Sequence, residues 1–491
     1  MNPSSAFSEP RLSPDSIQIS DVSYADPNGF VFFHQGGVYR AIRAGREGYY
    51  RALFEDGTAA ECIERSGLAA SEIVSGSIPD LNVRLLIRHK MIAPASHAPE
   101  WSPSMLKDAA LMTLDLAIGL AGRGRTLQDA NPWNVLFDGT DPRWIDLTSI
   151  VEAPSGMIWP AYQQFLNTFV HPLELMAMGK DRAARALMTD YVHGISQEEF
   201  TRHLTAGYSL KHPLRTLGLR IFDWASRRAQ RNAAGRMRWK KAPAQVTAGR
   251  IDPELRLRFL RGLRARVEKI NPSPDSKAFW KNYYADRGEA AADPASADRA
   301  GWSVKQRNVA DVLERLKPRR VTDLGSNTGW YSRLAARRAE RVVAADSDAA
   351  CADGLYLTAK KEGSNILPLV MDVLNPTPSL GSVQDMFPSA PDRIGGDLVL
   401  ALALIHHLHI TGRQSFVHIA RALRRYGPSA IVEFVDPEDP MARDLGTGRE
   451  VRYSLTDVVR EFESVFGSVE LLGSDVPTRR LMLCGVPRGG V

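Results

Sequence analysis

From Trp302 to Cys484, short apolar runs alternate with segments of helical periodicity, and this alternation restricts the fold more than any other feature of the chain. Strands that alternate with helices usually pair in parallel, in a sheet covered by helices on its faces. The sequence therefore predicts an α/β Rossmann-like domain over residues 301–491. We expect parallel strands near residues 321–324, 341–346, 365–372, 396–404 and 432–436, and two further strands near 467–475 and 478–486.

Length and composition frame this expectation. At 491 residues, with 44% apolar and 24% charged residues, the chain is long enough for two domains and a connector. Its three cysteines are scattered without the spacing of a zinc site or a disulfide framework, which fits a reducing cytoplasm. The longest apolar run, Leu398 to Ile405, is too short to span a bilayer, and the N-terminus has no apolar signal region. We therefore expect a cytoplasmic protein without a transmembrane segment.

The stretch "VTDLGSNTGWYS" carries the clearest chemistry of the C-terminal half. Gly325 and Gly329 bracket a tight turn between the first strand and the next helix, where the backbone can approach a ligand and the helix presents unpaired N–H groups. The second strand ends in Asp346, whose carboxylate can accept both hydroxyls of a ribose, and the third ends in Asp372. A dinucleotide dehydrogenase would have a third glycine inside the turn, where this chain has Asn327.

The stretch from about Trp302 to Cys484 resembles the class I S-adenosylmethionine-dependent methyltransferases. This resemblance implies a seven-stranded, mostly parallel sheet whose last two strands, near 467–475 and 478–486, form an antiparallel hairpin. The resemblance implies that the acidic strand end and the glycine turn hold the amino-acid end of the cofactor, that Asp346 binds its ribose, and that Asp372 contacts its adenine. Asn327 departs from the glycine that the family most commonly has at this place. The cofactor-binding residues that the resemblance implies are Asp323, Gly325, Ser326, Asn327, Gly329, Asp346, Asp372 and Leu402.

Candidates for acceptor chemistry follow the fourth and fifth strands. His406 and His407, with His409 nearby, follow the fourth strand, and an imidazole can take a proton from an acceptor near neutral pH. The alternative interpretation is a helix start in which the imidazoles are capped or packed in the core. Glu433 near the end of the fifth strand is a further candidate for binding an acceptor amine or hydroxyl. We expect a small-molecule or glycan-type acceptor, although the sequence does not identify it.

The N-terminal half begins with a probable hairpin over residues 30–42, whose turn we expect at Gly36 and Gly37. A strand near residues 83–89 follows, and then a helix over residues 101–122 that starts with Ser102 as its N-cap and Pro103 as its first residue. Strands followed by a long helix indicate a separate α+β domain.

After that helix, Asp129, Asn134 and Asp146 are spaced as a phosphotransferase spaces its base and metal ligands. From about Phe30 to Tyr208 the chain resembles the protein-kinase-like and aminoglycoside-phosphotransferase-like folds, which implies a kinase-like domain over residues 1–210. The resemblance implies that Asn134 and Asp146 bind Mg²⁺ with a nucleotide, as carboxylate and amide oxygens suit a hard cation.

The departures from a kinase are equally informative. Leu147 and Thr148 follow Asp146 in place of Phe-Gly, and neither a glycine-rich loop nor the usual lysine strand precedes it, although Arg40, Arg43 or Lys90 is a candidate substitute for that lysine. We expect a degenerate module that binds metal or nucleotide without transferring phosphate, or a structural remnant. The rivals are a phosphotransferase that uses Asp129, Asn134 and Asp146 with a nucleotide-binding second domain, and a non-catalytic scaffold protein.

Residues 211–300 form a basic connector between the two domains. Lys211 to Ile270 contains 17 Lys or Arg residues and four Asp or Glu residues, a local net charge of +13 against +6 for the whole chain. Nucleic acid, an acidic membrane surface or a phosphorylated substrate is one interpretation of this charge. Two solvated amphipathic helices are the interpretation we prefer, since no aromatic-rich nucleic-acid module accompanies the charge. Asp286 to Gly301 has the composition of a linker, so we expect a fragment that starts near Lys277 or Ala297 to fold and bind the cofactor alone.

Overall fold

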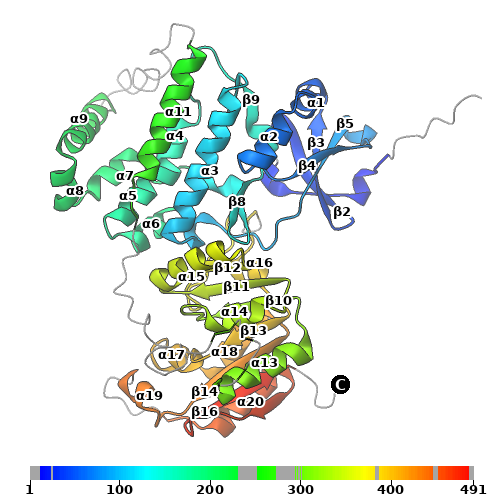
Figure 1. The fold of residues 1–491 in the computed structure, drawn as a ribbon, viewed down its shortest axis with the longest axis vertical. Helices are drawn as coiled ribbons and strands as arrows, with labels where there is room; N and C mark the ends of the chain where they lie inside the picture. The colour runs from blue at the N-terminus through cyan, green and yellow to red at the C-terminus, as the bar shows by residue number, and fades with distance from the viewer. Residues whose placement is uncertain are drawn as a thin grey trace, which may run out of the picture. The chain divides into compact units, whose positions relative to one another are not determined.

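The computed structural model divides the chain into two compact units (Figure 1). It describes residues 11–23, 26–230, 251–272, 293–294, 296, 299, 301–381, 386–445 and 452–485. The first unit comprises Met1–Ala93, Leu106–Leu136 and Pro142–Pro272, and the second comprises Pro94–Met105, Phe137–Asp141 and Ser273–Val491. This division differs from the expected contiguous domains, because two short segments of the N-terminal half belong to the second unit. The expected linker from Asp286 to Gly301 lies largely outside the described residues.

A five-stranded antiparallel sheet, in the order β1-β2-β3-β5-β4, opens the first unit. Its strands are β1 (Gln18–Ile19), β2 (Gly29–His34), β3 (Gly37–Arg43), β4 (Ser71–Val74) and β5 (Val83–His89). The predicted hairpin is β2-β3, but its turn lies one residue earlier than expected. Gln35 and Gly36 have the positive φ values, 47° and 75°, whereas Gly37 already pairs with His34 in the ladder. Two consecutive positive φ values match the right-handed twist of the strands that the turn joins.

Helices and two small sheets make up the rest of the first unit, and the start of α3 and the tip of the β7-β8 pair belong to the second (Figure 1). The helix predicted over residues 101–122 is α3, and the backbone N–H of Met105 donates to the Oγ of Ser102 at its start (3.4 Å). The helices are α1 (Glu47–Glu55), α2 (Thr58–Arg65), α3 (Pro103–Ala121), α4 (Tyr162–Phe165), the π-helical turn η7 (Leu166–Val170), α5 (His171–Ala177), α6 (Asp181–Leu187), α7 (Gln197–Arg202), α8 (Ala206–Lys211), α9 (Pro213–Gln230) and α11 (Pro253–Glu268). The small sheets pair β6 (Arg125–Leu127) with β9 (Ile150–Glu152), and β7 (Val135–Asp138) with β8 (Asp141–Trp144).

A seven-stranded sheet with the order β12-β11-β10-β13-β14-β16-β15 forms the core of the second unit. Its strands are β10 (Arg320–Leu324), β11 (Arg341–Asp346), β12 (Ile366–Val370), β13 (Leu398–Ala401), β14 (Ser429–Val435), β15 (Val469–Leu472) and β16 (Arg479–Cys484). The first five in this spatial order are parallel, and β16 pairs antiparallel with both β14 and β15. The helices are α13 (Val304–Leu316), α14 (Trp330–Ala336), α15 (Ala349–Glu362), α16 (Ala390–Ile394), α17 (Ile405–Ile410), α18 (Phe416–Tyr426), α19 (Pro440–Leu445) and α20 (Leu455–Phe466).

The strand order places a crevice beside β10. From β10 the chain builds outward through β11 to β12, and it then returns to the other side of β10 to form β13. At such a reversal the loops that leave neighbouring strands diverge above their carboxyl ends, and ligands of open α/β sheets bind there. Within the described residues, no helix combines the length and apolar character that crossing a bilayer requires.

Two segments from the N-terminal half complete the second unit. Glu100, in the short helix η4 (Ala98–Glu100), forms a buried ion pair with Arg393 of α16. The backbone N–H and the hydroxyl of Ser104 donate to the Asp353 carboxylate at 2.9 and 3.0 Å. Phe137 packs edge to face against Tyr356 of α15. The core of this unit is therefore built from three separate stretches of the chain.

Candidate functional site

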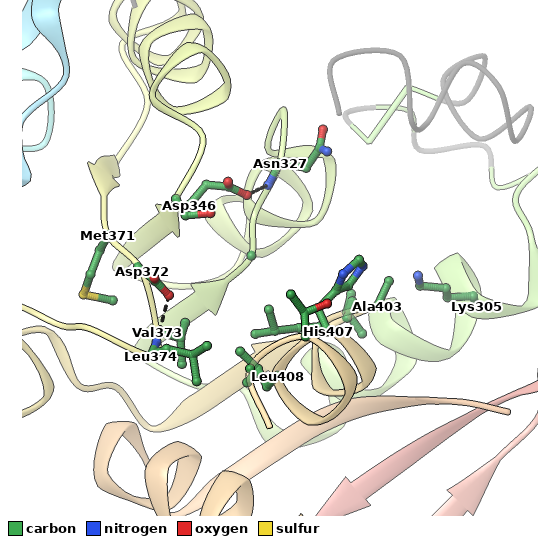
Figure 2. A pocket seen from close by; sticks show the side chains of 16 residues that line it. Lys305, Asn327, Asp346, Met371, Asp372, Val373, Leu374, Ala403, His407 and Leu408 are labelled. Carbon is green, nitrogen blue, oxygen red and sulfur yellow. Dashed lines mark hydrogen bonds between the residues drawn. The ribbon is translucent and has the colours of Figure 1, made fainter. Parts of the chain in front are cut away.

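A cavity of about 310 Å³ opens at the carboxyl ends of β10, β11, β12 and β13 (Figure 2). Its walls include five of the eight residues implied as cofactor-binding, namely Gly325, Asn327, Asp346, Asp372 and Leu402. These residues are separated by up to 77 positions in sequence, and the parallel strands bring them to one edge of the sheet. The remaining three, Asp323, Ser326 and Gly329, do not line the cavity.

The turn after β10 has a left-handed backbone at three positions. Gly325, Asn327 and Gly329 have φ values of 73°, 51° and 82°. Asparagine is among the residues that tolerate this region, so Asn327 takes a conformation for which glycine is otherwise the usual choice. A Cβ atom on Gly329 would lie only 2.4 Å from Cδ1 of Leu355, so a side chain there requires Leu355 to move and is strained by the left-handed φ as well.

Asp346 is the most firmly positioned carboxylate of the cavity. Its Oδ2 accepts the backbone N–H of Asn327 at 2.7 Å, and its Oδ1 accepts that of Asp348 at 2.8 Å. Burial raises the pKa of this carboxyl group above its usual value. Each carboxylate oxygen has a second lone pair, so Asp346 can accept two further hydrogen bonds from a ligand.

Asp323 lies beneath the turn and outside the cavity. Its side chain is 2% exposed and accepts a hydrogen bond from the Ser332 hydroxyl at 2.6 Å. Burial raises its pKa to about 7. The geometry gives Asp323 a supporting position, in which it ties the end of β10 to α14.

The histidines after β13 have different surroundings. His407 lines the cavity, whereas His406 is 2% exposed and does not. Burial, with the nearby His407, lowers the pKa of His406 to about 3. Burial, and then the charge of Arg479, also lowers the pKa of His407 below its usual value, so its imidazole is neutral at neutral pH. His409 stacks on Phe416 with ring centroids 4.2 Å apart, which matches the alternative expectation of a packed imidazole.

Glu433 lies in a buried ion-pair series outside the cavity lining. Its Oε2 is 2.6 Å from Nζ of Lys305, and its Oε1 is 3.7 Å from Nη1 of Arg479, which in turn pairs with Asp439. The Glu433 carboxylate is thus engaged by two cations and does not face the space where an acceptor would lie.

Lys305 is the cavity residue that the sequence pattern did not indicate. It comes from the first turn of α13, which precedes β10 in the sequence. Its ammonium also lies 5.2 Å from the centroid of the Tyr331 ring. The apolar walls were missed as well, although they directly follow the strand ends. They comprise Met371, Val373, Leu374, Ala403, Leu404 and Leu408.

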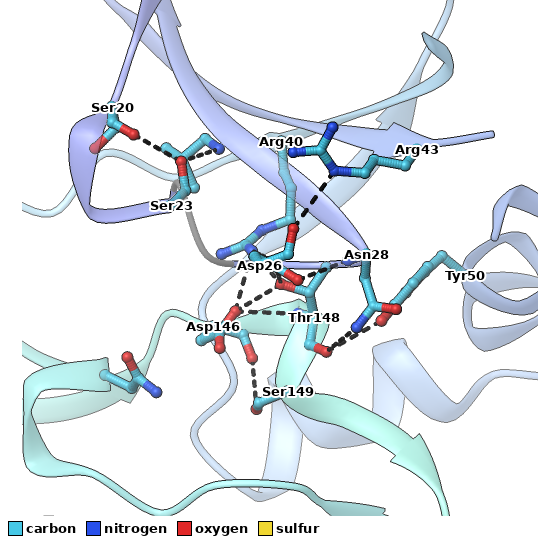
Figure 3. A network of polar contacts seen from close by, with 12 residues as sticks. Ser20, Ser23, Asp26, Asn28, Arg40, Arg43, Tyr50, Asp146, Thr148 and Ser149 are labelled. Carbon is cyan, nitrogen blue, oxygen red and sulfur yellow. Dashed lines mark hydrogen bonds and ion pairs between the residues drawn. The ribbon is translucent and has the colours of Figure 1, made fainter. Parts of the chain in front are cut away.

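In the first unit, the predicted acidic cluster is brought together around an arginine. Asn134 donates its amide N–H to Oδ1 of Asp129 at 3.1 Å. Burial, and then the charge of Asp146, raises the pKa of Asp129 to about 7. Arg40 of β3 places its guanidinium 3.0 Å from Oδ1 of Asp146 and 3.1 Å from Oδ2 of Asp26 (Figure 3).

Thr148 closes this network. Its hydroxyl contacts Arg40 and donates to the Asp146 carboxylate at 2.8 Å, and its backbone oxygen accepts the Tyr50 hydroxyl at 3.1 Å (Figure 3). Among the residues that the structure describes, no group of three or more His, Cys, Asp or Glu side chains has metal-binding geometry. Asp146, which the kinase resemblance implied as a Mg²⁺ ligand, is paired with the Arg40 guanidinium.

A curated protein is similar to the chain over most of its length. Over 440 residues it is 27% identical to the nodulation protein NoeA of Rhizobium meliloti (strain 1021), with 88% of each chain covered. No family model matches the sequence.

Similarity to solved structures is weaker. The bifunctional kinase-methyltransferase WbdD shares 17% identity over 42% of this chain and 42% of its own, with a TM-score of 0.28. The N-methyltransferase NodS from Bradyrhizobium japonicum shares 12% identity over 36% of this chain and 93% of its own, with a TM-score of 0.26. The chain thus spans less than half the length of WbdD, and scores this low do not assign an activity.

Proposed function

We propose that the second unit is an S-adenosylmethionine-dependent methyltransferase that acts on a small-molecule or glycan-type acceptor. The observation that carries this proposal is the position of Asp346, a carboxylate fixed by two backbone N–H groups at the end of β11, beside the left-handed turn after β10. Both features open into one cavity at the point where the strand order reverses.

The residues present fit this cofactor. Asp346 has the free lone pairs needed to accept two ribose hydroxyls. The glycine at position 325 lets the backbone of the turn approach a ligand, and the apolar side chains of Met371 and Leu374 offer a surface for a flat base. The ammonium of Lys305 brings a positive charge to the cavity, where a carboxylate of the cofactor or of the acceptor would pair with it.

S-adenosylmethionine supplies an electrophilic methyl group on its sulfonium. The protein's part is therefore to align the acceptor, to exclude water and to remove a proton when the acceptor is a hydroxyl or an ammonium. His407 is placed for that removal, because it lines the cavity and its lowered pKa keeps the imidazole neutral. His406 and Glu433 have no direct role in this scheme, since both lie outside the cavity lining.

We propose no phosphoryl transfer by the first unit. The Arg40 guanidinium pairs with Asp146, and the sequence contains neither a glycine-rich loop nor the usual lysine strand to hold a triphosphate. Asp129, Asn134 and Asp146 then serve as a hydrogen-bonded support of their loop.

Isothermal titration separates this proposal from its rivals. The whole protein should bind S-adenosylhomocysteine, and Asp346→Ala should weaken that binding by about 1.5–3 kcal/mol, because charge-assisted hydrogen bonds to the ribose are lost. Asp311→Ala is the matched control, as it removes an exposed carboxylate from α13 that pairs with Arg299. Binding of ATP with Mg²⁺ in place of S-adenosylhomocysteine would favour the phosphotransferase, and an unchanged affinity in folded Asp346→Ala would remove this residue from the site.

A further inference from the structure

Large apolar side chains lie exposed along α9 and at the end of α8. Leu210, Leu214, Leu217, Ile221 and Trp224 are 82%, 85%, 56%, 55% and 63% exposed. Successive members are separated by three or four residues, so within α9 they fall on a single stripe. We call these five residues the apolar stripe. Isolated exposed leucines are ordinary on protein surfaces, but a continuous stripe of this kind marks an interaction surface.

The opposite face of α9 is anchored within the first unit. Arg215 donates two hydrogen bonds to the buried Glu174 carboxylate, at 2.5 and 2.7 Å, and Tyr208 donates a third at 3.2 Å. Arg266 of α11 pairs with the same carboxylate at 3.1 Å. Of these residues, Arg215 belongs to α9 and holds its side of the helix toward Glu174, whereas the four stripe residues of α9 are exposed. The helix lies at the margin of the first unit (Figure 1).

Cations accompany the apolar stripe. Lys211, Arg220 and Arg228 are exposed, and the Arg228 guanidinium lies 5.7 Å from the centroid of the Trp224 ring. From Lys211 to Lys241 the sequence contains ten Lys or Arg residues and a single acidic residue, Asp223. Leu, Ile and Trp on one side of a helix with Lys and Arg beside them is the pattern of helices that lie in the interface of an anionic membrane.

We propose that α9 docks the protein on an anionic lipid surface, with the apolar stripe inserted at the level of the headgroups. The helix has 18 residues, so it offers about 27 Å of contact along the bilayer plane. The proposal is independent of the methyltransferase site and places the protein at the surface of a bilayer, without crossing it.

Two other occupants fit the observations less well. A second copy of α9 would bring two helices of high positive charge together, and Arg228, four residues after Trp224, would place a cation in the seam. Nucleic acid would satisfy the cations, but its phosphate backbone offers no partner for five exposed apolar side chains. Anionic lipids satisfy both groups at once.

Vesicle sedimentation with the full-length protein tests the proposal. Binding to phosphatidylcholine vesicles that contain one third phosphatidylglycerol should exceed binding to pure phosphatidylcholine by about tenfold or more, because each cation near an anionic surface contributes to attraction. Combining Leu217→Glu with Ile221→Glu should reduce binding about a hundredfold, since it removes apolar insertion and adds repulsion. Arg220→Gln should reduce binding about fivefold.

The matched control combines Leu357→Glu with Leu471→Glu, which places two glutamates at equally exposed apolar positions, 52% and 51%, in the second unit. This variant should bind vesicles like the unmodified protein. Absence of vesicle binding by the unmodified protein, or equal losses in the two double variants, would overturn the proposal. If the unmodified protein does not bind vesicles but forms a dimer that Leu217→Glu with Ile221→Glu disrupts, the occupant is a second copy of the chain. If it binds RNA but not vesicles, the occupant is nucleic acid.

Discussion

The Lys305 ammonium and the Glu433 carboxylate lie 2.6 Å apart, and their side chains are only 7% and 2% exposed. Arg479 and Asp439 extend this pair into a buried series of alternating charge that joins α13, β14, β16 and the start of α19. Lys305 also lines the cavity, so the ion pairs that hold these elements together also position the positive charge nearest to a bound ligand.

Removing one charged residue of this series should therefore lower the free energy of unfolding substantially. Glu433→Gln leaves the Lys305 ammonium without its counter-charge, and breaking a buried pair in this way costs about 3–5 kcal/mol. The double variant Lys305→Met, Glu433→Leu should lose less stability than Glu433→Gln alone, because no unpaired charge remains at Lys305. Urea denaturation of the three proteins measures the difference. A loss of about 1 kcal/mol or less for Glu433→Gln would show that the pair is hydrated and weak.

The two glycines of the turn after β10 should respond differently to substitution. A Cβ on Gly329 would meet Leu355 at 2.4 Å, whereas one on Gly325 would lie 3.3 Å from the nearest Leu404 atom. Both positions have a left-handed backbone, so Gly→Ala is strained at each by about 1–2 kcal/mol, and Gly329→Ala carries about 1–3 kcal/mol of overpacking in addition. Thermal melts should show the larger decrease in Tm for Gly329→Ala. Equal decreases would indicate that Leu355 moves aside without cost.

Gly325→Ala is then the more informative variant for ligand binding. It adds a methyl group at the cavity wall and removes less stability than Gly329→Ala, so loss of S-adenosylhomocysteine affinity in a folded Gly325→Ala protein would locate the ligand on the turn. Retained affinity would contradict the proposed approach of the backbone to the cofactor.

The second unit was predictable from sequence because its determinants are local. The apolar runs near residues 321–324 and 341–346 coincide with β10 and β11, since buried parallel strands need continuous apolar stretches between breakers. The acids and glycines at the strand ends were equally visible, because parallel strands collect their carboxyl ends at one edge.

Other features depend on contacts that no local pattern reveals. Lys305 precedes the first strand and reaches the cavity only through the packing of α13, and Glu433 has the residue type of a base but is held by Lys305 and Arg479. The turn at Gln35 and Gly36 was placed one residue too late, because a Gly-Gly pair offers two equivalent positions for positive φ.

Raising the pH should lower the stability of the folded protein through the side chain of Asp323. Its pKa is about 7 in the folded protein and 3.8 without burial, so between these values the folded state binds a proton that the unfolded state has released. The contribution of Asp323 to the free energy of unfolding is therefore fully present below the unfolded pKa and is lost as the pH rises through the folded pKa. In Asp323→Asn this loss should disappear, so the variant should gain stability relative to the unmodified protein as the pH increases. Parallel stability curves for the two proteins would contradict a raised pKa.

A fragment that starts near Ala297 should not fold alone, contrary to the expectation from the linker pattern. It would lack Glu100, which pairs with the buried Arg393, and Phe137, which packs on Tyr356. Loss of both segments removes a buried ion pair and an aromatic contact and exposes the apolar surface that they cover, a large change for a domain whose total stability is about 5–15 kcal/mol. We expect the fragment to be insoluble and to be rescued by co-expression of residues 1–296. A soluble fragment with a cooperative melt would show that the two upstream segments are dispensable.

Because of Arg40, we expect Mg²⁺ not to change the stability of the first unit. Its guanidinium neutralises Asp26 and Asp146 directly, in the place where a kinase would hold a metal ion near its acids. The Tm of the unmodified protein should therefore stay constant when MgCl₂ is added at fixed ionic strength. Arg40→Met keeps much of the volume but leaves Asp26, Asp129 and Asp146 without a cation, so it should be destabilised and should regain part of its Tm with Mg²⁺. Lys90→Met, outside this network, is the control and should not respond. Two results together would contradict this assignment: stabilisation of the unmodified protein by Mg²⁺ with ATP, and ATP-dependent phosphorylation of a substrate that Asp129→Asn abolishes. The first unit would then be a working kinase, and the assignment of all chemistry to the second unit would be wrong.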